Sequence, residues 1–208
     1  MPLAHLISGV VLGLSAGIAP GPLLTLVISQ SLSYGIAEGI KVAVAPLITD
    51  LPIIIVALVL GSQLAKAPLP LGLLSLAGAG YICYLAWESF GVRPAAQRTR
   101  VHSPDSVKKG VLTNALNPHP YFFWITVGTP FLHKSWAVAP RLAILWLMGF
   151  YTMLVGTKIL LSVLVGHWRN LLQGRVYLWI NRCLGLILLC FAVVLARDGL
   201  QLMGIWTD

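Results

Sequence analysis

Two ionisable side chains lie in the middle of long apolar stretches of this sequence, where charge is expensive. Asp50 is the central charge of the stretch 39–64, and Lys158 is the central charge of 138–166. On insertion scales one such residue costs about 2.5–3.5 kcal/mol at the centre of a membrane helix. The two can relieve this cost as a structural ion pair, or by facing a polar pathway. In the second case either group can carry a coupled proton and contact a solute.

A second set of candidate residues surrounds two Pro-x-Pro motifs. The first motif, Pro20-Gly21-Pro22, stands inside the stretch 3–33, which has no Asp, Glu, Lys or Arg. The second, Pro118-His119-Pro120, follows two amide side chains, Asn114 and Asn117. The amides either form hydrogen bonds to neighbouring helices or line a polar site. His119 either exchanges protons or shapes that site.

The prolines predict that the helices carrying them are broken. Proline lacks the N–H group and clashes with the carbonyl one turn back. A straight helix over 3–33 would span about 46 Å, which exceeds the membrane. Broken backbone is tolerated in a membrane only beside protein or a wet cavity, and its free N–H end suits a carboxylate. We therefore expect Pro20–Pro22 and Asn117–Pro120 to face each other across a central site; the alternative is two kinks that only shape packing.

The composition predicts an all-α integral membrane protein. The chain has 208 residues, of which 58% are hydrophobic and 10% charged, and its mean hydropathy is +0.87. A soluble domain does not have this balance. The net charge of +8 is therefore assigned to short loops that set orientation, and no nucleic-acid partner is expected. The three cysteines form no CxxC pair and have no metal-ligand spacing, so no metal or other cofactor is expected.

Six segments are long enough to cross a bilayer as helices. They are 3–33, 39–64, 69–90, 110–132, 138–166 and 176–202. Both Pro-x-Pro motifs fall in the first helix of a three-helix half, and a half with three crossings enters its second copy from the opposite side. The sequence thus predicts two inverted three-helix repeats with Pro-broken first helices, at 1–90 and 110–208, joined by a cytoplasmic link at 91–109.

Loop charges predict the orientation of the chain. With the link inside, nine cations lie on the cytoplasmic side: Lys41, Arg93, Arg98, Arg100, Lys108, Lys109, Arg169, Arg175 and Arg182. Four lie on the other side: Lys66, Lys134, Arg141 and Arg197. Both termini then face outward, and without cations ahead of the first apolar run no cleaved signal peptide is expected. Small residues repeat every four positions at Gly9, Gly13 and Gly17, which favours close packing in the bundle, with a homodimer contact as the alternative.

Three stretches carry a recognisable pattern: "GLSAGIAPGPLLTLVISQSLSYGIAEGIKVAVAPLITD" at 13–50, "GAGYICYLAWESF" at 78–90 and "GVLTNALNPHPYFFW" at 110–124. In these stretches the chain resembles the lysine exporter superfamily, in its amino-acid-efflux branch of lysine, homoserine and threonine exporters. The resemblance implies a six-helix protein of the bacterial inner membrane that exports amino acids or similar small metabolites, driven by the proton gradient. The positions that match the family pattern are Pro20, Gly21, Pro22, Asp50, Asn117 and Pro118. The chain departs from it at Ala45-Pro46 and His119-Pro120.

These observations predict a secondary transporter rather than an enzyme. A metal-ion exporter is one alternative, although only Asp50 and His119 offer ligands near the breaks. A structural membrane subunit is another, and two intramembrane charges and two breaks count against it. A thiol–disulfide electron carrier would need a cysteine at each break, where Gly21 and His119 stand instead.

Overall fold

A computed structural model of the protein describes residues 2–64, 68–90, 105–168 and 175–205. Within these ranges every regular element is a helix. The elements are α1 (Pro2–Ile18), α2 (Pro22–Tyr34), α3 (Ile36–Ala43), α4 (Ala45–Leu64), α5 (Pro68–Phe90), α6 (Ser106–Ala115), α7 (Pro118–Phe123), the π-helical turn η2 (Trp124–Gly128), α8 (Thr129–Val138), α9 (Pro140–Trp168) and α10 (Arg175–Leu202). Most of the predicted link, 91–104, lies outside the described residues.

Four helical stretches are long and apolar enough to cross a membrane: Ile36–Val59, Pro68–Phe90, Pro140–Trp168 and Leu178–Leu202. The bent pair Pro2–Ile18 and Pro22–Tyr34 makes a fifth if it counts as one span. The sixth predicted segment, 110–132, is divided among α6, α7, η2 and α8. An all-helical multi-pass membrane protein is thus confirmed, whereas the six crossings and the inverted repeat stay predictions.

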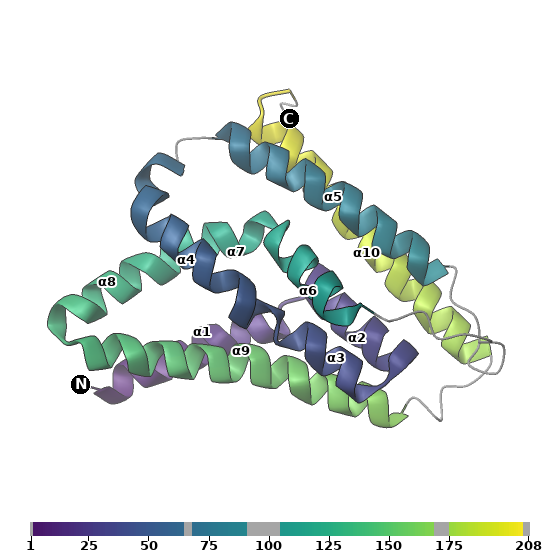
Figure 1. Ribbon diagram of the computed structural model, residues 1–208, viewed down its shortest axis with the longest axis horizontal. Coiled ribbons are helices and arrows are strands. Elements are labelled where there is room, and N and C mark those ends of the chain that lie inside the picture. Colours follow the sequence, from purple (N-terminus) through teal and green to yellow (C-terminus); the bar gives the residue numbers. More distant parts are fainter. Residues whose placement is uncertain (1, 65–67, 91–104, 169–174, 206–208) are drawn as a thin grey trace.

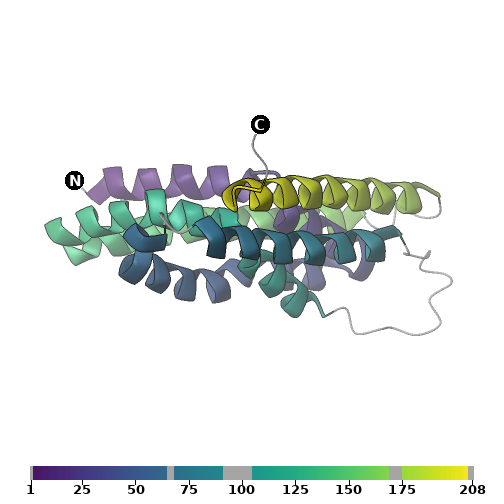
Figure 2. The ribbon, with the colours of Figure 1, turned by 90° about the horizontal axis from the view of Figure 1, so that it is seen from above.

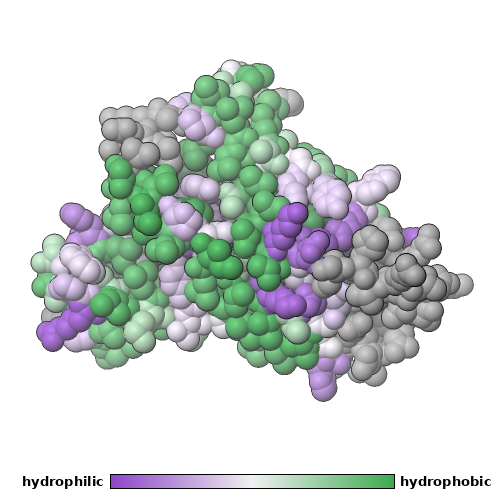
Figure 3. Space-filling model, in the orientation of Figure 1, coloured by the Kyte–Doolittle hydropathy of each residue, from purple (hydrophilic) through white to green (hydrophobic). Residues whose placement is uncertain are grey.

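The helices are arranged as two long pairs with shorter elements between them. α1 runs beside α9 along one edge, α5 beside α10 along another, and α2, α3 and α6 lie between (Figure 1). Seen from above, α1 and α10 lie along one face and α4 and α6 along the opposite face (Figure 2). Apolar residues cover most of the visible surface, while hydrophilic ones gather at the left end and in a group right of the centre (Figure 3). This pattern suits helices whose middle portions contact lipid.

Glycines hold α1 against α9. A Cβ atom at Gly9 would lie 2.3 Å from the carbonyl oxygen of Trp146, and one at Gly13 would lie 2.1 Å from that of Phe150. Larger residues therefore cannot occupy these positions unless the helices move apart. The four-residue glycine repeat is thus a packing face inside the chain, as the first of the two sequence interpretations expected. Close contact lets dispersion forces, rather than hydrophobic exclusion, hold the pair together.

Helix α2 is tied by polar contacts to three other helices. Its C-terminal half carries buried Gln30, Ser31 and Ser33. The contacts join Ser31 Oγ to Ser162 Oγ of α9 at 2.9 Å, Ser106 Oγ of α6 to Gln30 Oε1 at 3.0 Å, and Ser33 Oγ to Asn181 Oδ1 of α10 at 3.3 Å. Directly after α2, Gly35 adopts φ 104°, a conformation that favours glycine and lets the chain turn into α3.

We predict that Gly13→Ala destabilises the protein and that Gly156→Ala does not. The new methyl group at position 13 would collide with the backbone of Phe150, and overpacking of this kind costs about 1–3 kcal/mol. At Gly156 of α9 a Cβ atom would meet nothing within 4 Å. The measurement is the thermal unfolding midpoint of each variant in detergent. Equal midpoints for the two variants would contradict the close α1–α9 contact.

Candidate functional site

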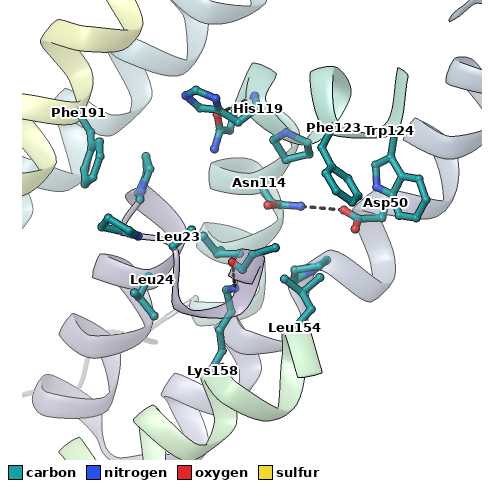
Figure 4. A pocket seen from close by; sticks show the side chains of 18 of the residues that line it. Leu23, Leu24, Asp50, Asn114, His119, Phe123, Trp124, Leu154, Lys158 and Phe191 are labelled. Carbon is teal, nitrogen blue, oxygen red and sulfur yellow. Dashed lines mark hydrogen bonds between the residues drawn. The ribbon is translucent and has the colours of Figure 1, made fainter. Parts of the chain in front are cut away.

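The two predicted breaks line one cavity. α1 ends at Ile18 and α2 begins at Pro22 with a bend of 65° between them, while α6 ends at Ala115 and α7 begins at Pro118. Residues from both breaks border a cavity of about 340 Å³ (Figure 4). This volume lies at the small end of the range for ligand pockets.

Nine of the ten residues singled out in the sequence line this cavity. They are Pro20, Gly21, Pro22, Asp50, Asn114, Asn117, His119, Pro120 and Lys158. The tenth, Pro118, is instead buried at the first position of α7, where its missing N–H group leaves no donor unpaired. The sequence therefore located the side chains around the cavity, although it could not supply their partners.

Asp50 is held by donors from several elements. Only 4% of this residue is exposed. The Nδ2 group of Asn114 donates to one carboxylate oxygen at 3.1 Å, and the hydroxyl of Tyr151 donates to the other at 3.2 Å. The indole nitrogen of Trp124 also points toward the carboxylate (Figure 4). The carboxylate is thus fixed at the cavity wall, because a buried charge needs such donors.

Lys158 binds the end of a broken helix. It is 3% exposed, and its ammonium group donates to the carbonyl oxygens of Ala16 and Gly17, each at 3.3 Å. These carbonyls belong to the last turn of α1, where an α-helix has no internal donors left and carries partial negative charge. A cation at this position supplies the missing hydrogen-bond donors and balances the partial negative charge.

Asp50 and Lys158 do not form an ion pair with each other. Ion pairs form elsewhere in the described residues, between Lys41 and Glu38 and between Lys109 and Glu88. The structure therefore does not have the direct pair considered as one alternative from the sequence. Each charge has its own partners at the wall of the same cavity.

The second break is shaped by a helix cap. Asn117 precedes α7 in an extended conformation, and its Oδ1 atom accepts a hydrogen bond from the backbone N–H of His119 at 3.1 Å. Asparagine is among the preferred residues for this position. Asn117 therefore both caps α7 and borders the cavity, whereas His119 has an exposed side chain at the cavity edge.

Apolar and aromatic side chains form the rest of the wall. These residues are Leu23, Leu24, Phe123, Trp124, Phe150, Leu154 and Phe191, and Figure 4 shows Phe123 and Trp124 beside Asp50. Sequence reasoning missed Trp124 and Tyr151 as partners of Asp50. A signal existed for Trp124, because it closes the quoted stretch "NPHPYFFW". None existed for Tyr151, which lies 101 residues from Asp50.

The described residues hold no group of three or more His, Cys, Asp or Glu side chains placed to bind a metal ion. Cys83, Cys183 and Cys190 are all exposed, and none of them lines the cavity. In the described part of the chain, the metal-ion alternative therefore has no ligand cluster to support it.

Several apolar spans and a cavity with Asp50 and Lys158 at its wall are the features of a multi-pass membrane protein with an internal polar site. The model of the LysE type translocator family matches residues 14–199, and the chain belongs to this family. Membership confirms the resemblance to the lysine exporter superfamily. The family consists of transporters rather than enzymes. No curated protein and no solved structure matches the chain.

We predict that the cavity admits water in the membrane-embedded protein. In a background with the three native cysteines replaced, Leu24→Cys at the cavity wall should react with a small, membrane-impermeant thiol reagent. Leu14→Cys, on the outward face of α1, should react at least about tenfold more slowly, because thiolates form poorly in apolar surroundings. Labelling rates in proteoliposomes, measured by mass spectrometry, test this. Equal rates would mean that the cavity is closed or dry.

Proposed function

We propose that this protein is a secondary transporter that exports amino acids or similar small metabolites from the cytoplasm by proton antiport. The observation that carries the proposal is the cavity between two helix breaks, with Asp50 and Lys158 on its wall. Broken helices beside a buried ionisable pair are the usual surroundings of substrate sites in secondary transporters. Membership in the LysE type translocator family supports a transporter of small molecules.

The polar groups of the cavity suit the two ends of an amino acid. The carboxylate of Asp50 is a partner for an α-ammonium group. The ammonium of Lys158 and the N-terminal end of α2, which has no side-chain cap, are partners for an α-carboxylate. A bound carboxylate would compete with the carbonyls of Ala16 and Gly17 for Lys158. Substrate binding is thereby linked to the position of α1.

Antiport follows if Asp50 holds either a proton or the substrate ammonium, but not both. A proton arriving from outside would displace the ammonium, and a substrate arriving from the cytoplasm would displace the proton. One carboxylate that alternates between two cations couples their opposite movements. Asn114 and Tyr151 keep the carboxylate in place during both exchanges.

The proposal includes six crossings in two inverted repeats in the bacterial inner membrane, with both termini outside. Helix contacts support the repeat. Helix α1 is the first half of segment one, and it packs on α9 of segment five. Helix α6 is the first half of segment four, and it packs on α3 and α4 of segment two. The third and sixth segments, α5 and α10, pack on each other. Exchanging the halves leaves this set of contacts unchanged, as an inverted repeat requires.

We predict that Asp50→Asn abolishes gradient-driven export. Proteoliposomes with an imposed pH gradient are given a mixture of amino acids and related metabolites, and mass spectrometry identifies what moves. Wild-type protein should move at least one solute, and Asp50→Asn should lower that flux at least about tenfold, because the amide cannot bind a proton or pair with an ammonium. Asp198→Asn is the matched control, since Asp198 does not line the cavity, and it should keep wild-type flux.

Lys158→Met is tested alongside. If Asp50→Asn and Lys158→Met both retained transport, neither charge would belong to the mechanism. Absence of movement of any solute by wild-type protein, with the fold confirmed by circular dichroism, would contradict the transport proposal itself.

A further inference from the structure

We infer that the cavity accepts amino acids with an uncharged, apolar side chain and rejects both dibasic and acidic amino acids. This inference rests on the proposed function, because it concerns the same cavity. Three observations carry it: the inventory of charges at the wall, the partners that the other carboxylates have, and the residue types that surround the remaining space.

The charges at the cavity wall balance once Asp50 has given up its proton. Among the described residues, the cavity wall has one acidic side chain, Asp50, and one lysine, Lys158. A zwitterion brings one positive and one negative group and leaves the sum unchanged. A dibasic amino acid adds one uncompensated positive charge, and an acidic one adds one uncompensated negative charge. In both cases the extra charge would lie unpaired in a buried cavity inside the membrane, which costs free energy.

No other described carboxylate is placed to receive a second ammonium group. The chain has six acidic residues. Glu38 is paired with Lys41 and Glu88 with Lys109, and neither glutamate borders the cavity. Asp105 and Asp198 also lie outside its wall, and Asp208 is outside the described residues.

The remaining wall suits an apolar side chain. Phe123 and Leu154 border the space near the charges, Leu23 and Leu24 border it from α2, and Phe191 borders it from α10 (Figure 4). Each methylene group buried against such a wall strengthens binding about fourfold. Leucine, methionine and phenylalanine gain from this contact, whereas the charged ends of lysine and glutamate lose their hydration there.

The test measures relative fluxes of leucine, methionine, lysine, arginine and glutamate in wild-type proteoliposomes with an imposed pH gradient. Leucine and methionine should move at least about tenfold faster than the charged amino acids. A tenfold ratio corresponds to less free energy than an unpaired charge costs inside a membrane. Faster or equal movement of lysine or arginine would overturn the inference and leave the transport proposal standing. No movement of any amino acid would instead end the proposal that amino acids are the substrates, and the inference with it.

A gain-of-function pair tests the charge argument directly. His119→Glu adds a second carboxylate at the cavity edge, in the first turn of α7, where an acid is tolerated. His119→Gln has nearly the same shape without the charge. The ratio of lysine flux to leucine flux should rise at least about tenfold in the Glu variant relative to the Gln variant. Equal ratios would overturn the inference. If the His119 variants do not fold, Phe191→Glu and Phe191→Gln make the same comparison from α10.

Discussion

The whole arrangement depends on one constraint: backbone groups freed by a helix break inside a membrane must find partners, since lipid offers none. At the first break the carbonyls of Ala16 and Gly17 receive the ammonium of Lys158. At the second, the N–H of His119 donates to the side-chain oxygen of Asn117. Proline at the start of α2 and of α7 removes one more donor that would otherwise need a partner. The breaks are therefore stabilised by the same residues that give the cavity its polar wall.

Packing and site are coupled through helix α9. The glycine face of α1 allows α9 to approach until Cβ atoms at Gly9 and Gly13 would touch its backbone. That approach carries Lys158 to the end of α1, and the same helix α9 carries Tyr151, which donates to Asp50 of α4. A looser α1–α9 contact would move Lys158 away from its partners on α1. Small residues far from the cavity thus help to determine its charge distribution.

Local chemistry made part of this structure predictable. Proline acts on its own backbone, and a lone charge in an apolar run is conspicuous, so the breaks, Asp50 and Lys158 could be found from the sequence. Their partners could not, because Lys158 meets carbonyls 142 and 141 residues away, and carbonyls carry no sequence signal. The direct Asp50–Lys158 pair was the simplest solution to two buried charges, yet the free end of α1 offers Lys158 an alternative. In the segment 110–132 the prolines predict the break before Pro118, whereas nothing in the sequence marks the π-helical turn at Trp124–Gly128.

The polar ties of α2 have a kinetic consequence. Gln30, Ser31 and Ser33 connect one short stretch of this helix to α6, α9 and α10. Any rearrangement that shifts α2 against these three neighbours must exchange the three contacts together, since they lie within one turn. Such exchanges give a barrier with a large enthalpy, because several hydrogen bonds are stretched before new ones form. The slow step of a transport cycle in this fold would then be strongly temperature-dependent, whatever solute occupies the cavity.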